Sequence, residues 1–570
     1  MRDLLVLVLG VLTLVGTALP AGAQEASTAP VDVGVYGGSV RFEAGPDGVL
    51  DVDGERRYAD TIELRVNGSE LVFINELSIE GYLEGLAEVP ARWPEEALKA
   101  QAVAARTYAW NSIELGTFGR RGLGYDICAT VACQVFHGRD VVEGPFGERW
   151  AAAVAETAGE VLLYEGEPIL TRYSSSSGGR TQSNEEVFPR EGPRPYLKGV
   201  DDPYDEVSPF HRWTVRFTRD EFDALLARGE SLSTAVPVAD ASVRAVDGGE
   251  DQLVVVGRDG TRVEVGVSAF RFFASDVAPS IDAERFPGPR ADGGRLPATL
   301  PSSRFDIEVG ETEVVLEGRG FGHGVGMSQY GALGQAEAGI PYDDILASYY
   351  QGLRPTTSPD LPGRVRVGLE NDVDEPLTVT GDAPFRIVAS GEVVTERALG
   401  TWQLVPRADG SVQLLGPPGY GTPLVVATTT ASRLRPTAVE VVTLETVVSK
   451  TSELVLEVAA VDGRRVRTRS LGVVAPGRQV ATWDLDDDDG VAVPPGEYRA
   501  RLVATDEESS SAGEAVTIDV APLEPTGPAP SLLAPLPGGP GAGGPTPYAV
   551  AALLGLAVGA FAGAVVRVRR

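Results

Sequence analysis

One glutamate, Glu88, stands in the segment of the chain that is richest in residues able to do chemistry. It lies between Ala87 and Val89, just before a helix that Pro94 and two acidic residues are expected to start. A carboxyl group among apolar neighbours has a raised pKa, as a general acid needs near neutral pH. From the spacing alone, an exposed loop carboxylate remains the simpler interpretation.

The predicted helix after Glu88 carries two cations seven residues apart, Lys99 and Arg106, on one face. A cation beside Glu88 would lower the pKa of its carboxyl group and weaken it as an acid. Another, narrow face consists of small and apolar residues and predicts close packing against a neighbouring element. That face is formed by Leu98, Ala102, Ala105 and Ala109.

A second segment, residues 318–331, reads GRGFGHGVGMSQYG and has glycine at every other position up to Gly326. One side of this segment carries no side chains, so we expect something to approach its backbone closely. The spacing satisfies neither a dinucleotide-binding loop nor a Walker loop, which disfavours a nucleotide site. His323, within it, is by itself more typical of a structural histidine.

The only two cysteines, Cys128 and Cys133, lie five positions apart. Nearby cysteines in a secreted protein most simply form a disulfide, which is our prediction. A catalytic thiol paired with His323 lacks a supporting local signature. With only three histidines in the chain, a site for several metal ions is hard to build.

The two ends of the chain predict its location. Residues 1–23 have the apolar run and the A-x-A site of a cleaved signal peptide. Residues 548–566 form an uncharged stretch long enough to cross a bilayer core of about 30 Å, and the tail 567–570 carries three arginines. We therefore expect a single-pass protein of the cell membrane, with its bulk outside the cell and facing the cell wall.

The chain has 570 residues, and 49 basic against 81 acidic side chains give a net charge of −32. This charge argues against a nucleic-acid partner, which needs clustered lysines and arginines. Without the three arginines of the predicted tail the outer region is still more acidic, so charge will not draw it to anionic wall polymers. A wall polymer must then be held by shaped contacts.

The pattern between the ends predicts an α+β region followed by all-β modules. We expect a catalytic region over residues 30–360 and a small β module over 361–440. Residues 441–522 show the short alternating runs of a β-sandwich, and 523–547 form a linker rich in Pro, Gly and Ala. The segment WDLDDDDGVAVPPGEYRARLVA resembles the Ig-like module of flagellar hook-capping proteins, which carries no catalytic residues.

The run WPEEALKAQAVAARTYAW after Glu88 and the run GHGVGMSQYGA of the Gly-rich segment together resemble the stage II sporulation protein D family, also called the amidase-enhancer family. The resemblance covers residues from about 60 to 360. It implies a peptidoglycan lytic transglycosylase that acts on glycan strands whose stem peptides have been removed, as in cell-wall remodelling or sporulation. The catalytic glutamate of the family's E-x-P element corresponds to Glu88 in AEVP.

The resemblance also bears on the other site residues. We assign Lys99 and Arg106 either to the lactyl carboxylates of the substrate or to a structural ion pair. Neutral donors and acceptors suit a ligand rich in hydroxyl groups, which makes five residues candidate sugar contacts. These candidates are Tyr173, Ser175, His323, Ser328 and Gln329.

Two alternatives stay open. Some members of the family bind zinc around the block that holds Cys128 and Cys133, but Ala132 stands where such members can have a histidine, and His137 is the only imidazole nearby. We therefore expect no cofactor, with zinc at the two cysteines as the less favoured reading. The family's other name supplies the second alternative, a non-catalytic wall-binding enhancer of an N-acetylmuramoyl-L-alanine amidase.

Overall fold

The computed structural model describes residues 29–522, apart from several short gaps. The predicted signal peptide (1–23), linker (523–547), membrane span (548–566) and tail (567–570) lie outside the described residues. Within the described part, no helix is both long and apolar enough to span a bilayer. The gaps are 47, 68–69, 121, 247–248, 291–292, 370–375, 423, 428, 438–439 and 508.

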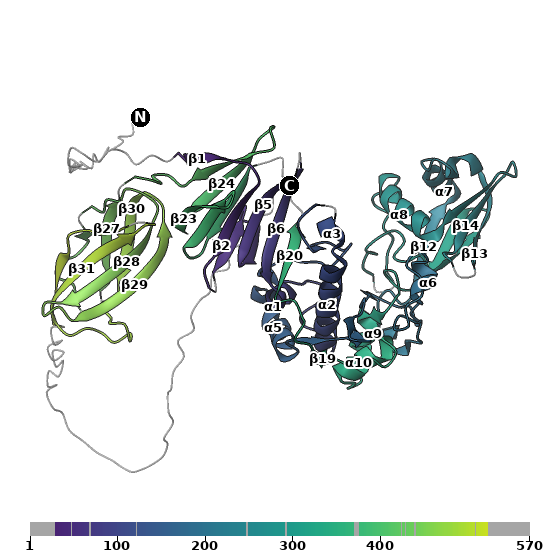
Figure 1. Cartoon of the computed structure of the whole chain (residues 1–570), viewed down its shortest axis with the longest axis horizontal. Coiled ribbons are helices and arrows are strands. Elements are labelled where there is room, and N and C mark those ends of the chain that lie inside the picture. Colours follow the sequence, from purple (N-terminus) through teal and green to yellow (C-terminus); the bar gives the residue numbers. More distant parts are fainter. Residues whose placement is uncertain are drawn as a thin grey trace, which may run out of the picture. The chain divides into compact units, whose positions relative to one another are not determined.

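Two sheets share the largest hydrophobic core of the chain (Figure 1). In strands such as β2 (Ser39–Ala44) and β24 (Thr401–Pro406), side chains alternate between buried and partly exposed, as expected of a half-covered sheet. The first sheet has the order β1 (Val31–Tyr36), β25 (Val412–Gly416), β24 (Thr401–Pro406), β21 (Leu377–Gly381), β3 (Val49–Val52) and β4 (Arg56–Ala59). The second has the order β23 (Glu392–Ala398), β22 (Phe385–Ala389), β2 (Ser39–Ala44), β5 (Thr61–Asn67), β6 (Glu70–Ser78), β20 (Arg364–Leu369) and β7 (Ile127–Cys128).

These pairings correct the predicted boundary at residue 360. Strand β20 pairs with β6, β22 pairs with β2, and β25 pairs with β1, so residues 364–416 complete the sheets that residues 31–78 begin. The separate β module expected over 361–440 is therefore wrong. An alternating sequence predicts a strand but does not say which distant edge that strand will find, since any exposed edge offers the same unpaired N–H and C=O groups.

Helix α2 (Glu95–Leu115) is packed on two sides, which explains its small residues. The face predicted from Leu98, Ala102, Ala105 and Ala109 is buried in the core of the two sheets, and this prediction is confirmed. The opposite face, with Ala100, Val103 and Ala104, lies in a second core against two later helices. The helices around α2 are α1 (Ile79–Glu84), α5 (Gly147–Glu156), α9 (Gln329–Glu337) and α10 (Tyr342–Tyr349).

Residues 213–318 build a third core of their own. It lies between two three-stranded antiparallel sheets, of which β12, β17 and β16 form one and β13, β14 and β15 the other, with two helices. Their bounds are β12 (Trp213–Thr218), α7 (Arg219–Leu226), β13 (Val238–Arg244), β14 (Gln252–Gly257), β15 (Arg262–Gly266), α8 (Val267–Val277), β16 (Phe305–Val309) and β17 (Glu313–Gly318).

The C-terminal described residues form the predicted all-β, Ig-like module around a fourth core, in which the Trp483 and Tyr498 rings meet edge to face at 5.5 Å. Its first strand, β26, precedes residue 441, the predicted start of this module. The strands are β26 (Thr430–Ala431), β27 (Val442–Val448), β28 (Ser452–Ala460), β29 (Arg465–Val474), β30 (Gly477–Trp483), β31 (Gly496–Thr505), β32 (Ser510–Ala512) and β33 (Val516–Val520).

Short elements connect these bodies. The helical ones are α3 (Thr117–Arg120), α4 (Asp140–Glu143), α6 (Asn184–Val187), η1 (Pro203–Val207), η2 (Leu232–Ala235) and η3 (Ala278–Ser280). The two-residue strands are β8 (Glu160–Val161), β9 (Leu163–Tyr164), β10 (Glu167–Pro168), β11 (Tyr173–Ser174), β18 (Met327–Ser328) and β19 (Thr356–Thr357). Strands β11 and β18 pair in parallel and bring residues 173–179 (YSSSSGG), which we call the Ser/Gly loop, beside the Gly-rich segment.

Candidate functional site

The loop that carries Glu88 runs between α1 and α2 and is fixed to the segment after the two cysteines. The backbone just before the glutamate pairs with that segment: Ala87 donates to the Val135 carbonyl at 2.9 Å, and His137 donates to the Gly85 carbonyl at 2.8 Å. Gly85 is needed here, because a side chain at this position would collide with the Phe136 ring. The loop therefore presents Glu88 in one defined place.

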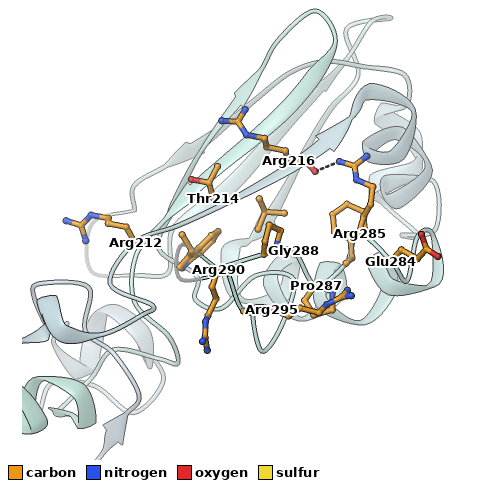
Figure 2. Close-up of a pocket in the computed structure, with 15 residues that line it drawn as sticks. Arg212, Thr214, Arg216, Glu284, Arg285, Pro287, Gly288, Arg290 and Arg295 are labelled. Atoms are coloured by element: carbon orange, nitrogen blue, oxygen red, sulfur yellow. Dashed lines mark hydrogen bonds between the residues drawn. The ribbon is translucent and has the colours of Figure 1, made fainter.

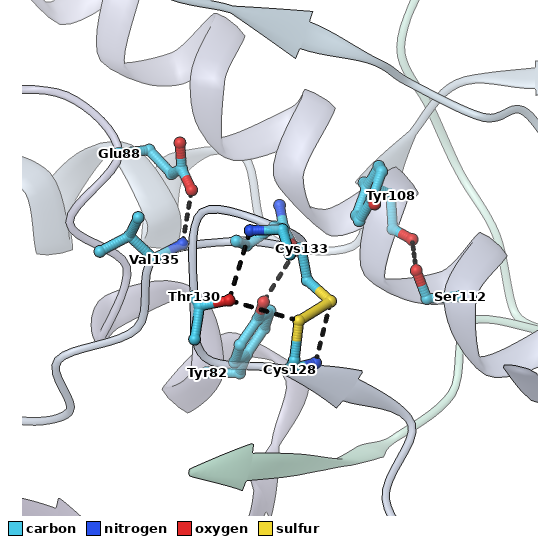
Figure 3. Close-up of a disulfide and its surroundings, with 10 residues drawn as sticks. Tyr82, Glu88, Tyr108, Ser112, Cys128, Thr130, Cys133 and Val135 are labelled. Carbon is cyan, nitrogen blue, oxygen red and sulfur yellow. Dashed lines mark hydrogen bonds between the residues drawn. A yellow bond between two sulfur atoms is a disulfide. The ribbon is translucent and has the colours of Figure 1, made fainter. Parts of the chain in front are cut away.

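The Glu88 carboxylate is partly exposed and receives two hydrogen bonds. The Val135 N–H donates to Oε1 at 2.6 Å (Figure 3). The Gln329 amide donates weakly to Oε2 at 3.4 Å and to the Glu88 carbonyl at 3.3 Å. Burial raises the pKa of Glu88 to about 6, against the lowering effect of these two hydrogen bonds. A group with this pKa is protonated in a useful fraction near neutral pH and can also act as a base.

Neutral phenol groups surround Glu88. The Tyr82 hydroxyl donates to the Gln134 side chain at 2.8 Å, and the Gln134 amide donates in turn to the Tyr173 hydroxyl at 2.8 Å. The Tyr108 ring lies 6.4 Å from the Tyr173 ring. Burial, with the Glu88 charge adding to it, raises the pKa of all three tyrosines. All three therefore stay uncharged. Tyr108 and Tyr173 are partly exposed and offer hydroxyl groups and ring faces beside the carboxyl group, whereas Tyr82 is fully buried.

The predicted disulfide between Cys128 and Cys133 is present, with the Cα atoms 5.5 Å apart. It closes the turn directly before Gln134 and Val135, the two residues that contact the Tyr82 hydroxyl and the Glu88 carboxylate (Figure 3). Both sulfur atoms are used in this bond, so neither cysteine offers the thiolate that zinc needs. Over the described ranges, no group of three or more His, Cys, Asp and Glu side chains is arranged to hold a metal ion.

The backbone of the Gly-rich segment is in close contact with other parts of the same chain. A side chain at Gly318 would meet the Trp213 ring, one at Gly322 would meet Ser174, and one at Gly326 would meet the Arg172 carbonyl. Gly320, Gly322, Gly324 and Gly326 also all have positive φ angles, between 72° and 96°. The expectation that the bare side of this segment receives another group is confirmed, and the group that it receives is the Ser/Gly loop and its neighbours.

A buried carboxylate, Asp205, ties the Ser/Gly loop to the Gly-rich segment. It has no exposed side-chain surface and accepts five sets of hydrogen bonds. The donors are the Ser176 hydroxyl (2.9 and 3.0 Å), the Ser177 N–H (2.8 Å), the Gly178 N–H (2.8 Å), the Ser328 hydroxyl (2.8 Å) and His211 Nδ1 (2.9 Å). Sequence reasoning missed Asp205, since an isolated Asp in a loop carries no signal of burial.

Ser328 is part of this network and not a sugar contact, which corrects the prediction. Its fully buried hydroxyl donates to Asp205 and accepts from Ser177 N–H and Gly331 N–H, both at 3.1 Å, so that it caps α9. The next residue, Gln329, begins α9 and reaches Glu88. Ser328 therefore acts as a positioning residue for Gln329.

His323 is also structural. Its Nδ1 accepts from the Val325 N–H at 3.0 Å, and its ring lies edge-on to the Phe188 ring at 5.7 Å. Burial, aided by nearby arginines such as Arg172, lowers the pKa of His323 to about 3, so the ring stays neutral at physiological pH. Its predicted role as a sugar contact is not supported by this position, whereas Ser175, partly exposed in the Ser/Gly loop, stays a predicted contact.

Lys99 and Arg106 were predicted either to bind the lactyl carboxylates of the substrate or to form structural ion pairs, and both form ion pairs within the chain. Lys99 lies between Glu95 (2.5 Å) and Glu156 (2.6 Å), and these hydrogen bonds and charges raise its pKa against the effect of burial. Arg106 is completely buried and makes a two-pronged ion pair with Glu80, at 2.9 and 2.6 Å. A side chain without exposed surface cannot contact a ligand, so the substrate-binding prediction is wrong for Arg106 and unsupported for Lys99.

The structure thus brings together three of the predicted residues, Glu88, Tyr173 and Gln329. It adds Tyr82 and Gln134, which the sequence did not single out because a tyrosine or glutamine near a helix is more typical of packing. Among the described residues that set the pKa of Glu88 there is no second carboxylate. The arrangement can donate and accept one proton at a single carboxyl group and can hold a neutral, hydroxyl-rich ligand.

The pKa of Glu88 predicts how rate and stability change with pH. If the protonated form starts the reaction, kcat/KM falls about tenfold per pH unit above pH 6. The folded chain also holds this proton more tightly than the unfolded chain, whose carboxyl group has the ordinary value of 4.5. The stabilisation is complete below pH 4.5 and is lost as pH rises through 6, by about 2 kcal/mol.

Rate profiles and denaturant unfolding between pH 4 and 8 measure both effects, with Glu88→Gln as the reference for stability. The wild-type chain should lose stability relative to this variant as pH rises. A rate that stays flat between pH 6 and 8, or identical stability profiles, would contradict the assigned pKa.

Comparison with known proteins adds to this picture. Residues 67–164 match the family model "Stage II sporulation protein", and residues 432–508 match "FlgD Ig-like domain". The chain is 32% identical over 328 residues to an uncharacterized protein of Brachyspira hyodysenteriae, an alignment that covers 56% of this chain and 77% of the relative. It is 30% identical over 295 residues to stage II sporulation protein D of Bacillus subtilis, covering 49% of this chain and 74% of that protein.

A third relative is the amidase enhancer of Bacillus subtilis, 29% identical over 296 residues. That alignment covers 47% of this chain but only 39% of the enhancer. The matched part of the chain includes the Glu88 loop and the disulfide. The Ig-like module is matched separately, by a different family model.

Proposed function

This chain belongs to the stage II sporulation protein D family, and on that premise we propose that it is a peptidoglycan lytic transglycosylase. A cell-wall-related function follows from the family. The proposed reaction cleaves the bond between N-acetylmuramic acid and N-acetylglucosamine in glycan strands that have lost their stem peptides. The observation that carries the proposal is Glu88 itself, a partly exposed carboxyl group with a pKa of about 6 and no second carboxylate among the described groups that set that pKa.

The proposed chemistry needs only one carboxyl group. Protonated Glu88 gives its proton to the glycosidic oxygen as the bond from that oxygen to C1 of the muramic acid breaks. The 6-hydroxyl oxygen of the same sugar then forms a new bond to C1, and its proton passes to the Glu88 carboxylate. The product is a 1,6-anhydro ring, the acid is restored, and no water is consumed. A glycosidase that uses water or a covalent intermediate would need a second carboxylate.

The neighbours of Glu88 have matching roles in this proposal. The Val135 N–H and the Gln329 amide stabilise the carboxylate after it has lost its proton and keep its pKa from rising further. Tyr173 and Ser175 lie on the Ser/Gly loop and supply neutral groups for the hydroxyl and acetamido groups of the sugar. The pair Gln134 and Tyr82 orients Tyr173 through two hydrogen bonds of 2.8 Å.

A second candidate function is supported by the relative named amidase enhancer. In that case the chain would bind the wall and stimulate an N-acetylmuramoyl-L-alanine amidase without cleaving glycan. Either function requires access to the wall. We therefore propose the location expected from the ends of the chain, a cell-membrane protein with a signal peptide, one C-terminal span and its bulk outside the cell.

The two functions separate in a product analysis. The purified chain is incubated with intact peptidoglycan and with glycan stripped of its stem peptides, and the soluble products are identified by mass spectrometry. The transglycosylase proposal expects anhydro-disaccharides from stripped glycan and little from intact wall. If neither substrate yields product while an added amidase is stimulated, the chain is an amidase enhancer and not a transglycosylase.

A further inference from the structure

A pocket lined by arginines lies between strand β12 and the segments over residues 284–290 and 293–295, with a volume of about 830 Å³. Figure 2 shows the Arg212 side chain at one end of this pocket and the Arg285 side chain at the other. We call it the arginine pocket and define it by five arginines that line it. These are Arg212, Arg216, Arg285, Arg290 and Arg295.

The charge of the arginine pocket opposes that of the whole chain. The chain has a net charge of −32, yet the described residues that line the pocket include five arginines and one carboxylate, Glu284. Two arginines are neutralised by carboxylates outside the lining: Arg216 pairs with Glu313 at 2.8 Å, and Arg285 pairs with Glu221 at 2.5 Å. Concentrating positive charge in a concave site attracts anions.

Two of the remaining arginines have no carboxylate partner in the described part of the chain. Arg212 donates only to the backbone carbonyls of Gly178 (2.8 Å) and His211 (2.9 Å), and the exposed Arg295 donates to the Ala283 carbonyl at 3.1 Å. Carbonyl partners leave the charge of a guanidinium group uncompensated. Its planar donors then suit a carboxylate or a phosphate of a ligand.

The rest of the lining is apolar. Trp213, Val215, Phe286, Pro287 and Gly288 lie between the arginines. Phe286 is almost fully buried and stacks on the Phe217 ring at 4.5 Å, so this wall is rigid. Apolar walls with a few charged groups are typical of sites for small, partly apolar ligands, and the volume fits such a ligand. A sugar that carries a carboxylate has both properties.

Aromatic contacts connect the arginine pocket to the Glu88 loop. The Arg290 guanidinium lies 5.4 Å from the Phe210 ring, which lies 6.0 Å from the Tyr330 ring, and Tyr330 in turn contacts Trp93 at 5.2 Å. Tyr330 directly follows Gln329, the residue that donates to Glu88. These contacts place the arginines within the length of a strand of several sugars from the Glu88 loop.

We propose that the arginine pocket binds free lactyl carboxylates of the glycan strand whose cleavage Glu88 catalyses. This inference rests on the proposed function, which places a glycan strand at Glu88. Removal of a stem peptide converts the lactyl amide of muramic acid into a carboxylate, so each muramic acid of stripped glycan carries a negative charge on the sugar itself. The arginine pocket thereby recognises the stripped state of the strand.

The test measures binding of stripped glycan oligomers in the Glu88→Gln background, so that the ligand is not consumed. Arg212→Gln combined with Arg295→Gln, the two arginines with carbonyl partners only, should weaken binding about tenfold, and raised salt should reduce the difference. The matched control is Arg244→Gln with Arg262→Gln, the same change of charge on the exposed β13–β15 sheet. Melting temperatures of both double variants verify that they are folded.

Two further ligands make the result specific. Stripped glycan whose lactyl carboxylates have been converted to methyl amides should bind equally to the pocket variant and to the control. A glycerol-phosphate polymer should bind more weakly than stripped glycan. Equal binding of stripped glycan to both double variants overturns the proposal, and so does tighter, arginine-dependent binding of the phosphate polymer.

The outcome is separate from that of the proposed function. If glycan binding depends on the arginines but the wild-type chain releases no anhydro product, the arginine pocket is supported and the transglycosylase activity is wrong. If the wild-type chain releases anhydro product but the arginine substitutions leave glycan binding unchanged, the transglycosylase activity is supported and the arginine pocket is wrong.

Discussion

The Glu88→Gln variant is expected to release anhydro product from stripped glycan about a thousandfold more slowly than the wild-type chain. The amide keeps the size of the side chain and still accepts the hydrogen bond from the Val135 N–H. It can neither give a proton to the leaving oxygen nor take one from the 6-hydroxyl group. General acid–base catalysis contributes about 10²–10⁴ to a rate, and here one residue has both roles. Initial rates of product release at pH 6 measure the effect.

The matched control is Glu84→Gln. Glu84 is the last residue of α1, four positions before Glu88, and its half-buried carboxylate pairs with Arg139 at 3.0 Å. This variant should keep its rate within about twofold, since a pair of this exposure contributes little. If Glu88→Gln retained more than a tenth of the wild-type rate, Glu88 would not be the acid. If that variant still stimulated an amidase fully, the enhancer function would be favoured.

The Asp205→Asn variant is expected to destabilise the region around the Ser/Gly loop by about 4 kcal/mol. Asp205 is fully buried and accepts from two backbone N–H groups, two serine hydroxyls and His211. Asparagine has one acceptor oxygen in place of two, and its NH₂ group would face donors that then lack a partner. Differential scanning calorimetry and amide exchange at Ser177 and Gly178 measure the loss, with the Ig-like module as an internal reference.

The control for Asp205→Asn is Asp201→Asn. The Asp201 side chain is 84% exposed and pairs with Arg180 at the surface, so this substitution should cost less than about 0.5 kcal/mol. Asp205→Asn should also lower activity, because Ser328 loses its acceptor and no longer holds Gln329 against Glu88. Similar unfolding transitions for the two variants would contradict the structural role given to Asp205.

Local sequence patterns predicted the helices and the alternating strands well. The start of α2 after Pro94 and the burial of its small residues follow from signals within one segment. Strand pairing does not, because it joins segments hundreds of residues apart. The pairing of β22 with β2 places residues 385–389 beside residues 40–44, and nothing within either segment specifies the other. The predicted boundary at residue 360 failed for this reason.

The same distinction applies to the site. Glu88, Tyr173 and Gln329 were predicted from motifs, and the contacts of Gln329 with Glu88 join them across 241 positions of the chain. The hydrogen bond from Val135 and the burial of Asp205 depend on tertiary packing and leave no trace in composition or spacing. Arg106 shows the opposite error. A helical arginine looks exposed in sequence, yet its partner Glu80 lies 26 positions away, and the pair is enclosed by the fold.

The origin of the oxygen at the new chain end tests the central claim most directly. Stripped glycan is cleaved by the wild-type chain in water enriched in heavy oxygen, and the products are analysed by mass spectrometry. The account predicts muramic acid ends that are lighter by one water than the hydrolytic product and carry no heavy oxygen, because the 6-hydroxyl of the sugar attacks C1. Reducing ends that carry heavy oxygen would show that water attacks, and they would contradict a mechanism built on Glu88 alone.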